Sequence, residues 1–306
     1  MNVLVFGSRG LVGSSIVREL IKDDRKYNVI SSSRQDTDLF SAEETKKKIT
    51  ISNPDIVIIA AAKVGGIHAN NTEKFQFISE NIKISLNIFE SLISFPKTTI
   101  INIGSSCIYP LDAQSPLKED SLMTGKLEPT NSPYAMAKLA SLEMGYSLME
   151  QYGHNVINIM PTNLYGPNDT FDELKSHVIP GLIYKMHKSK VLKKETVELW
   201  GSGKPLREFM YVQDFSAAVR FIIENNPKSQ LLNIGTGEEI SIYDLAYEIK
   251  SVVDFKGEIL FNTNYPDGNP RKLLDSSKIN ELGWKSKVSL REGLEKTYEW
   301  FLENNN

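Results

Sequence analysis

The segment VLVFGSRGLVGSSIVREL, from Val3 to Leu20, carries the strongest signal for the fold. A short apolar run leads into Gly7, Gly10 and Gly13, and apolar residues at helical spacing follow. Glycines between a strand and a helix let the backbone approach a pyrophosphate, whose charge is then held at the helix N-terminus. The segment therefore predicts a dinucleotide-binding site, although its G-x-x-G-x-x-G spacing differs from the commoner G-x-G-x-x-G.

Further apolar runs follow in the first half of the chain: NVISSS, DIVIIAA, TTIINIG and NVINIMPTN. Helical patterns such as EKFQFISENIKISLNIFESLI separate them. Continuous apolar strands are typical of a parallel sheet that helices cover on both faces. The predicted fold class is α/β, a doubly wound parallel sheet (Rossmann-like) with a smaller α/β substrate-binding domain. We assign residues 1–165, with a returning segment at about 207–235, to the cofactor domain, and residues 166–206 and 236–306 to the substrate domain.

The composition excludes several classes of protein. The chain has 306 residues, 41% of them hydrophobic and 24% charged, and a formal net charge of -3. It therefore lacks the basic excess of a general nucleic-acid binder. No signal peptide or apolar stretch of membrane-spanning length is evident, and one cysteine permits no internal disulfide. We expect a cytoplasmic protein without nucleic-acid or membrane partners, and without a metal because its histidines lack ligand spacing.

The end of the second predicted strand, ISSSRQD, concerns cofactor choice. In NAD sites of this architecture an acidic residue there binds the ribose 2′-hydroxyl, whereas this chain has Arg34. Arg9 lies inside the glycine loop. Two guanidinium groups suit a 2′-phosphate, which favours NADP(H) as the cofactor. The alternative is that Arg34 is an ordinary solvated loop residue.

The segment TNSPYAMAKLASLEMGYSLMEQYG predicts a helix with Ser132 as N-cap, Pro133 at its first position and Gly153 at its end. Tyr134 and Lys138 then share one face. An ammonium near the phenol favours phenolate and lowers its pKa, so the phenol can exchange a proton with a carbonyl or alcohol while hydride moves.

The segment GSSCIYP places the chain's single cysteine, Cys107, at the end of a predicted strand. Ser105 there would donate a hydrogen bond to the same substrate oxygen as Tyr134. Two plainer interpretations remain open from the residues alone: Ser105 and Ser106 end the strand through local backbone bonds, and Cys107 is a small buried hydrophobe.

The chain resembles the extended short-chain dehydrogenase/reductases that act on nucleotide sugars. The resemblance covers nearly the whole sequence and lies in the segments GSRGLVGS, AAAKVGGIHANN, GSSCIYP, LEPTNSPYAMAK, MPTNLYGPND, SHVIPGL, WGSGKPLREF and PDGNPRKLLD. It implies conversion of GDP-4-keto-6-deoxy-D-mannose to GDP-L-fucose, by inversion at C3 and C5 followed by reduction of the C4 ketone with NADPH. It also implies a homodimer formed through helices near 73–94 and 133–152.

The resemblance assigns roles by motif position. Ser105, Tyr134 and Lys138 form the reductase triad, and Cys107 and His177 form the acid/base pair for epimerisation. The implied cofactor-binding residues are Gly7, Ser8, Arg9, Gly10, Leu11, Val12, Gly13, Arg34, Asp38, Leu39, Ala61, Lys63, Lys138, Pro161, Asn163, Leu164 and His177. The implied substrate-binding residues are Val64, Gly65, Ser105, Ser106, Cys107, Tyr134, Asn163, His177, Lys185, Trp200, Arg207 and Arg271.

One position departs from the family pattern, and several alternatives stay open. Lys185 stands where the pattern has an arginine facing the diphosphate, which removes a bidentate contact. His177 read alone is equally a loop histidine, and Trp200 an ordinary core residue. The rival functions are reduction or epimerisation of a related GDP-4-keto sugar, such as a heptose, and non-catalytic sensing of NADP(H). A 4,6-dehydratase is disfavoured because SSCIYP contains no carboxylate pair.

Overall fold

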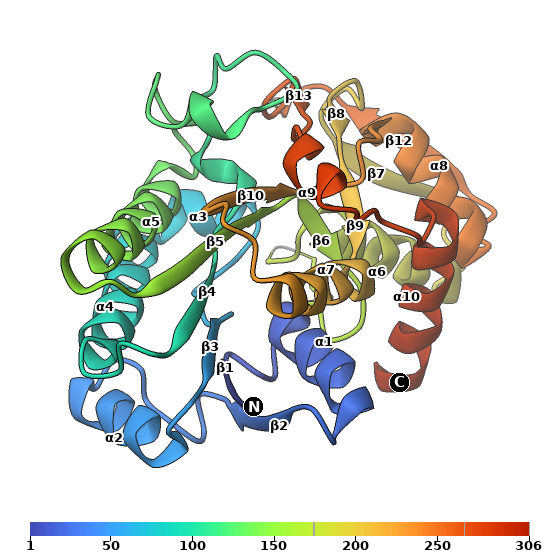
Figure 1. The fold of residues 1–306 in the computed structure, drawn as a ribbon. Coiled ribbons are helices and arrows are strands. Elements are labelled where there is room, and N and C mark those ends of the chain that lie inside the picture. Colours follow the sequence, from blue (N-terminus) through green and yellow to red (C-terminus); the bar gives the residue numbers. More distant parts are fainter. Residues whose placement is uncertain (174, 266, 306) are drawn as a thin grey trace.

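A six-stranded parallel sheet forms the centre of the computed structural model, which describes residues 1–173, 175–265 and 267–305 (Figure 1). The strand order is β10-β5-β4-β3-β1-β2, and every neighbouring pair is parallel. The strands are β1 (Asn2–Phe6), β2 (Asn28–Ser32), β3 (Ile56–Ile59), β4 (Thr99–Ile103), β5 (Asn155–Pro161) and β10 (Leu231–Ile234). The predicted doubly wound sheet is confirmed.

Helices cover both faces of this sheet, as its apolar strands require. In β1, Val3 and Val5 pack with α1 and α7, whereas Leu4 and Phe6 pack on the other face with α2, α4 and α5. Successive side chains of a strand point to opposite faces, so each run of buried residues serves two cores. The helices are α1 (Leu11–Leu20), α2 (Ala42–Ser52), α3 (Ile67–Thr72), α4 (Lys74–Leu92), α5 (Ser132–Tyr152) and α7 (Val212–Asn225).

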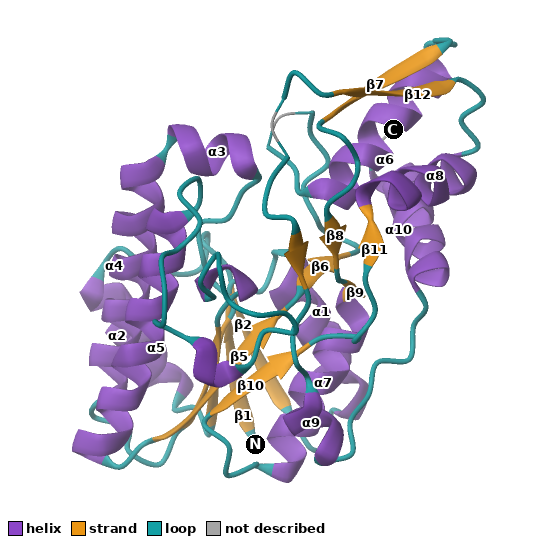
Figure 2. Ribbon diagram, turned by 90° about the horizontal axis from the view of Figure 1, so that it is seen from above, coloured by secondary structure: helices purple, strands orange, loops and turns teal. Residues whose placement is uncertain are grey.

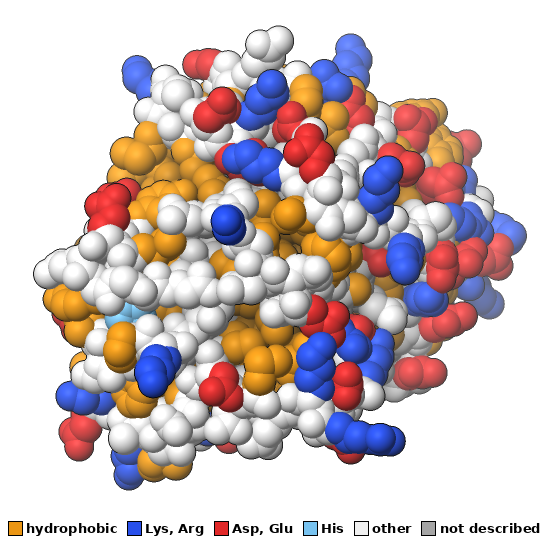
Figure 3. All heavy atoms as spheres, viewed as in Figure 1, with side chains coloured by type: hydrophobic (Ala, Val, Ile, Leu, Met, Phe, Trp, Pro, Cys, Tyr) orange, Lys and Arg blue, Asp and Glu red, His pale blue; other side chains and the backbone are white. Residues whose placement is uncertain are grey.

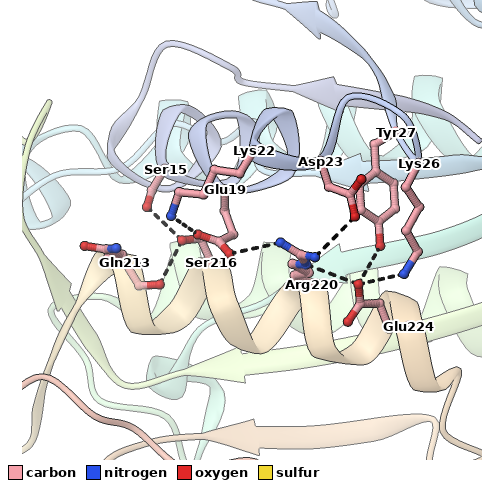
Figure 4. Close-up of polar contacts among 10 residues, drawn as sticks. All are labelled: Ser15, Glu19, Lys22, Asp23, Lys26, Tyr27, Gln213, Ser216, Arg220 and Glu224. Atoms are coloured by element: carbon pink, nitrogen blue, oxygen red, sulfur yellow. Dashed lines mark hydrogen bonds and ion pairs between the residues drawn. The ribbon is translucent and has the colours of Figure 1, made fainter.

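Helix α7 returns from the second half of the chain to pack against α1 (Figure 4). The Ser15 hydroxyl donates to the Ser216 hydroxyl at 3.0 Å in the buried part of this contact. At its outer end, the Arg220 guanidinium faces the carboxylates of Glu19, Asp23 and Glu224 at 3.7, 3.5 and 3.1 Å. A buried hydroxyl pair and a shared guanidinium therefore attach the returning segment to the helix that follows the glycine loop.

A second group of elements lies at the carboxyl ends of the central strands (Figure 2). Its apolar core contains residues of α6, α8 and α10 with the strand pair β7 and β12. The elements of this group are β6 (Asn163–Tyr165), α6 (Val178–Val191), β7 (Thr196–Trp200), β8 (Leu206–Arg207), β9 (Phe209–Tyr211), β11 (Ile240–Ser241), α8 (Ile242–Val253), β12 (Glu258–Asn262), β13 (Arg271–Lys272) and α10 (Leu290–Asn304). Helix α9 (Ser277–Glu281) packs instead beside β10 of the central sheet, and the short 3-10 turns Ile21–Asp23, Ser106–Ile108 and Glu119–Ser121 lie in the first half of the chain. The division into two domains remains a prediction.

Two local predictions differ from the structure. The run NVINIMPTN forms two strands, because the chain leaves the central sheet after Pro161 and Asn163–Tyr165 pairs with β9 instead. The N-cap of α5 is Asn131, not Ser132. The Glu128 carboxylate accepts hydrogen bonds from the backbone N–H groups of Thr130 and Asn131 at 3.0 and 3.1 Å, and so organises the turn that leads into the helix.

The surface agrees with the composition. Lys and Arg side chains are interspersed with Asp and Glu on the face drawn in Figure 3. Within the described ranges, no helix has the length and apolar character to cross a bilayer.

Candidate active site

The glycine loop between β1 and α1 is closely packed. Gly7 has a φ of +81°, and a Cβ there would lie 2.7 Å from the carbonyl carbon of Ala60. A Cβ on Gly13 would lie 2.2 Å from the Gly7 carbonyl oxygen. Gly10 is the N-cap of α1 and has room for a methyl group. Glycine is therefore required at two of the three positions, and the loop brings bare backbone to the N-terminus of α1.

A cavity of about 620 Å³ opens beside this loop. It is lined by most of the predicted cofactor residues, namely Gly7, Arg9, Gly10, Leu11, Val12, Arg34, Asp38, Leu39, Ala61, Lys63, Lys138, Pro161, Asn163, Leu164 and His177. The buried Ser8 and Gly13 belong to the loop but are not among the lining residues. Of the predicted substrate residues, Val64, Gly65, Ser105, Ser106, Tyr134, Asn163 and His177 line the same cavity.

Both candidate 2′-phosphate arginines lie at one end of the cavity. Arg9 donates a hydrogen bond to the Gln35 side chain, and the Arg34 guanidinium lies 5.5 Å from the centre of the Phe40 ring. The nearby Asp36 carboxylate accepts from the backbone and hydroxyl of Ser33 at 2.8 and 2.6 Å, which lowers the pKa of Asp36. The cavity therefore ends at the two cationic side chains of Arg9 and Arg34, whereas the Asp36 carboxylate is hydrogen-bonded to Ser33 of its own loop.

Tyr134 and Lys138 lie on the same face of α5, at the wall of the cavity. The Lys138 ammonium donates to the carbonyl oxygen of Ile103 at 2.8 Å and lies 5.9 Å from the centre of the Tyr134 ring. Burial lowers the pKa of Lys138 to about 8. Burial also raises the pKa of Tyr134, with a further rise from the Cys107 charge and an opposing effect of the Ser105 hydroxyl. The expectation of a lowered tyrosine pKa is thus wrong, because desolvation of the phenolate dominates.

Cys107 lies in the short 3-10 turn Ser106–Ile108 after β4. Its backbone N–H donates to the Ser105 hydroxyl at 3.3 Å, and its buried side chain packs in an apolar cluster with Leu117 and Leu274. Burial raises the pKa of the Cys107 thiol, while Lys272, Ser105 and Lys138 oppose that rise. Cys107 is not among the cavity-lining residues, but its neighbours Ser105 and Ser106 are.

His177 is the N-cap residue of α6 and lines the cavity. Desolvation lowers the pKa of its imidazole. Helix α6 thereby carries His177 to the cavity from the second half of the molecule, whereas Ser105 and Tyr134 come from the central sheet and α5. The structure therefore brings together, around one cavity, groups from segments far apart in the sequence.

The remaining predicted substrate residues lie outside the cavity. Trp200 is 49% exposed, stacks on Tyr265 at 4.5 Å between ring centres, and has the Lys185 ammonium 5.1 Å above its ring, so it is not a core residue. Arg207 is partly buried, and that burial lowers its pKa. The exposed Arg271 pairs with Glu239 at 2.8 Å, and the structure does not bring it to the cavity.

Sequence reasoning missed three residues near these groups. Asp169 lines the cavity with one buried carboxylate oxygen that has no hydrogen-bond partner among the described residues, and burial raises its pKa to about 7. Tyr265 forms the stack with Trp200. Lys272 interacts electrostatically with Cys107. Asp169 is the last residue of the quoted segment MPTNLYGPND, so its neighbourhood to the site could have been inferred from that segment. Tyr265 and Lys272 are placed by long-range contacts alone.

The cavity, the glycine loop and the paired Tyr134 and Lys138 define a dinucleotide-dependent enzyme of the epimerase and reductase class. The chain belongs to the NAD dependent epimerase/dehydratase family, whose model matches residues 3–235. Its curated relatives are more particular. A GDP-L-fucose synthase of Sinorhizobium fredii (strain NBRC 101917 / NGR234) is 45% identical, with 99% of this chain and 96% of the relative covered. The GDP-L-fucose synthase of Escherichia coli (strain K12) is 41% identical, with 99% and 97% covered.

Solved structures give the same class. A GDP-6-OMe-4-keto-L-xylo-heptose reductase from C. jejuni is 32% identical and superposes with a TM-score of 0.91, covering 99% of this chain and 98% of that one. A GDP-L-fucose synthetase from Naegleria fowleri bound to NADP is 28% identical with a TM-score of 0.90, covering 99% and 94%. The family resemblance read from the sequence is confirmed. Among the described residues, no group of acidic, histidine or cysteine side chains has the arrangement of a metal site.

Proposed function

We propose that this protein converts GDP-4-keto-6-deoxy-D-mannose and NADPH to GDP-L-fucose, by epimerisation at C3 and C5 and reduction at C4. The observation that supports it most directly is the conjunction of two sets of groups around one cavity, all of which line it except Cys107, the residue after the lining Ser106. Ser105, Tyr134 and Lys138 are the set for ketone reduction, and Cys107 and His177 are the set for proton transfer. Full-length relatives with 41–45% identity carry the name GDP-L-fucose synthase.

The residues present fit a dinucleotide. A Cβ at Gly7 or Gly13 would collide with backbone, so glycine at these positions lets the loop pack closely on its neighbours while Gly7 and Gly10 line the cavity, where backbone can meet a pyrophosphate. We assign Arg9 and Arg34 to the 2′-phosphate of NADP(H), consistent with a neighbour whose structure is bound to NADP. When bound, the nicotinamide supplies the hydride for reduction. Asp38 and Leu39 are assigned to the adenosine end of the cavity.

In the proposed epimerisation, Cys107 and His177 move protons at C3 and C5. The hydrogens on these carbons are acidic because the C4 ketone delocalises the carbanion as an enolate. Inversion requires proton removal on one face of the ring and delivery on the other, so two groups are needed. The Ser105 hydroxyl and Tyr134 donate hydrogen bonds to the C4 oxygen and stabilise the enolate.

In the proposed reduction, Tyr134 transfers its proton to the C4 oxygen. The resulting phenolate needs a counter-charge, because burial alone raises the pKa of Tyr134. The Lys138 ammonium provides it from the next turn of α5. Ser105 and Tyr134 therefore serve both stages through the same substrate oxygen.

The nucleotide half of the substrate is assigned to the second group of elements. The exposed Trp200 and Tyr265 rings offer a flat surface with the Lys185 ammonium over it, and we assign Arg207 to the diphosphate as a further positive charge. Because Lys185 lacks the planar fork of arginine, we expect weaker hold on the diphosphate than an arginine would give. Arg271 could bind the substrate as proposed only if its ion pair with Glu239 were broken.

A second candidate function is reduction of a related GDP-4-keto sugar such as a heptose, favoured by the superposition on the C. jejuni heptose reductase. The two candidates differ in the need for Cys107 and His177. A non-catalytic NADP(H) sensor requires neither these residues nor the Tyr134 and Lys138 pair, so we disfavour it.

We also propose a homodimer formed through α4 and α5. A groove of about 320 Å³ runs between these helices and is lined by Leu86, Phe89, Glu90, Ile93, Ala140, Glu143, Met144, Ser147, Leu148, Gln151 and Tyr152. Most of its lining surface is apolar, and Leu86, Ile93 and Tyr152 are exposed in the single chain. A cytoplasmic location and the absence of nucleic-acid partners remain predictions.

The deciding experiment separates the two stages. The protein is incubated with GDP-4-keto-6-deoxy-D-mannose in heavy water without NADPH, deuterium at C3 and C5 is followed by NMR, and NADPH is then added. Exchange at both carbons followed by GDP-L-fucose supports the proposal, whereas reduction without exchange supports the related-sugar reductase. If neither exchange nor reduction occurs, the proposed substrate is wrong.

Two variants assign the stages to residues. Cys107→Ser is expected to lose exchange by ~10²-fold or more, the usual contribution of a general base, and to retain C4 reduction. Tyr134→Phe is expected to lose reduction while its NADPH affinity stays close to that of the wild type. Normal turnover by Tyr134→Phe would remove this residue from the mechanism.

A further inference from the structure

Lys272 is a lysine near the reacting groups to which the proposed mechanism gives no role. It lies on β13, opposite Arg207 in the parallel pairing with β8, and its side chain is only partly exposed. Within the described part of the chain, its ammonium has no hydrogen bond and no ion pair with a carboxylate. A partly buried cation without such a partner is costly, which indicates that it serves an anion at the site.

The backbone next to Lys272 is held in place from several directions. The backbone N–H of Leu274 donates to the buried Glu208 carboxylate at 3.1 Å. The Leu273 carbonyl accepts from the Leu117 N–H at 2.7 Å, and the Asp275 N–H donates to the Leu117 carbonyl at 2.9 Å. Residues 273–275 are thereby fixed against the loop that follows Cys107.

The same contacts bring the strand close to the cysteine. Leu117 and Leu274 belong to the apolar cluster that contains the Cys107 side chain. The chain therefore passes from that cluster to Lys272 within two residues. The backbone of Lys272 is thereby brought near this cluster, although Lys272 and Cys107 are far apart in the sequence.

The charged and titratable groups around this pair come from several elements. Lys272 and Lys138 both lower the pKa of the Cys107 thiol, against the larger effect of burial. Tyr134 also interacts electrostatically with Cys107. Burial lowers the pKa of Lys272, and Cys107 opposes that effect, while Arg207 and Glu128 act on Lys272 in opposite directions. Lys138 donates to the Ile103 carbonyl and is assigned to the reductase stage, so of the two cations that act on the thiol Lys272 is the one without another proposed role.

We propose that Lys272 is a positioning residue that stabilises the thiolate of Cys107 and thereby makes Cys107 the group that removes protons from the sugar. In this step the thiolate Sγ takes the proton, the C–H electron pair moves toward the C4 oxygen as an enolate, and His177 returns a proton to the opposite face. No oxidation or reduction occurs, and solvent restores the proton states of both groups. The inference deepens the proposed function and rests on it for the sugar, but the proposed coupling between Lys272 and Cys107 is tested without any sugar.

The first test is a titration of the thiol. Because the chain has one cysteine, labelling cysteine with carbon-13 at Cβ gives a single NMR resonance whose shift reports the ionisation of Cys107. Removing a nearby positive charge disfavours the thiolate, so Lys272→Met is expected to raise the apparent pKa of Cys107 by about one unit. At any pH well below the midpoint of the titration, this variant would then contain ~10-fold less thiolate than the wild type. Lys272→Arg is expected to keep the wild-type midpoint within a few tenths of a unit.

Lys126→Met is the matched control, because Lys126 is exposed and its loss changes the net charge equally. Its titration should match the wild type. Lys272→Gln provides a second neutral variant if circular dichroism shows that Lys272→Met is unfolded. The same midpoint in wild type and in a folded neutral variant overturns the proposal. A neutral variant that only weakens GDP binding also overturns it, because Lys272 would then serve the diphosphate alone.

The second test uses the sugar. Without NADPH, Lys272→Met is expected to exchange deuterium at C3 and C5 about 10-fold more slowly at neutral pH, with recovery as the pH rises, because one unit of thiol pKa is a tenfold change in thiolate. An exchange rate that falls equally at every pH contradicts the role. If the wild type exchanges neither carbon, the proposed function fails, while the thiol titration still decides whether Lys272 and Cys107 are coupled.

Discussion

The clearest physical constraint at the residue scale is the burial of charged groups beside Tyr134. Lys138 is only 8% exposed, and its hydrogen bond to the Ile103 carbonyl does not offset the loss of hydration. Its pKa therefore falls to about 8. The two groups of the reductase pair are thus adjusted in opposite directions by the same burial, since the pKa of Tyr134 rises. A negatively charged ligand near Lys138 reverses its shift.

We predict that binding of NADP⁺ weakens as the pH rises above about 8, the pKa to which burial lowers Lys138. The bound dinucleotide carries negative charge, so it raises the pKa of Lys138. Above a pH of about 8, where Lys138 of the free protein is largely neutral, binding is therefore accompanied by uptake of a proton by Lys138. Calorimetry in buffers of different ionisation enthalpy measures that uptake directly. Lys138→Met should bind more weakly and lose the proton uptake. A wild-type affinity that is constant from neutral to alkaline pH would contradict the prediction.

At the scale of elements, the turn between β1 and α1 combines two demands. The Gly7 N–H and the Ser8 N–H both donate to the Ser32 carbonyl of β2, at 2.9 and 3.1 Å, which fixes the turn to the sheet. Gly13 in the first part of α1 then packs directly on the Gly7 carbonyl. The shape of the glycine loop is therefore set by the contact between α1 and the loop that precedes it.

Gly13→Ala tests this packing. The added methyl group meets the Gly7 carbonyl oxygen at 2.2 Å, so loop or helix must move. We expect a loss of ~1–3 kcal/mol in the free energy of unfolding, typical of overpacking, together with weaker NADPH binding. Chemical denaturation and a fluorescence titration measure the two effects.

Gly10→Ala is the matched control for stability. A Cβ at Gly10 lies 3.6 Å from the same Gly7 oxygen, which is an ordinary contact. Alanine differs from glycine here only in being a poorer N-cap, so we expect Gly10→Ala to lower the free energy of unfolding by less than ~1 kcal/mol, a smaller loss than that of Gly13→Ala. If the two variants have equal stability, close packing at Gly13 does not shape the loop.

The whole molecule presents α4 and α5 as an outer layer. These helices pack on each other and on one face of the central sheet, and their outer surface carries the groove between them. Tyr134 and Lys138 lie at the start of α5 and the groove lies farther along the two helices. Association through this layer would leave the cavity open to the cofactor.

We predict that Leu86→Glu converts the protein to monomers. Leu86 is 39% exposed in the single chain and lines the groove, and a symmetric interface would bury the new carboxylate twice. An unpaired buried charge is strongly unfavourable, so the dimer dissociation constant should rise by at least ~10². Sedimentation velocity measures this change.

Val191→Glu is the control for Leu86→Glu. Val191 is 63% exposed at the end of α6, far from the groove in sequence and on a different layer. Its sedimentation should equal that of the wild type. A wild-type protein that sediments as a monomer, or a Leu86→Glu variant that remains dimeric, rules out this interface.

The features that could be predicted from the sequence are those encoded by neighbouring residues. The glycine loop follows a strand and precedes a helix within Val3–Leu20, and Tyr134 and Lys138 are one helical turn apart, so local geometry places each set. The apolar runs likewise predicted the parallel sheet, because strands buried on both faces need continuous apolar side chains. The sequence by itself therefore determined the class of fold, the glycine loop between the first strand and helix, and the placement of Tyr134 one helical turn before Lys138.

The arrangement between these features was decided only by the tertiary structure. The segment that follows Lys272 reaches the apolar cluster of Cys107 because β13 pairs with β8 and residues 273 and 275 hydrogen-bond to Leu117. Arg271, its neighbour in the chain, instead pairs with Glu239. Adjacent strand residues point to opposite sides, so no local pattern tells which of the two meets the site. The pKa of Tyr134 was likewise misjudged, because desolvation depends on all the atoms that enclose the phenol and not on the lysine four residues away.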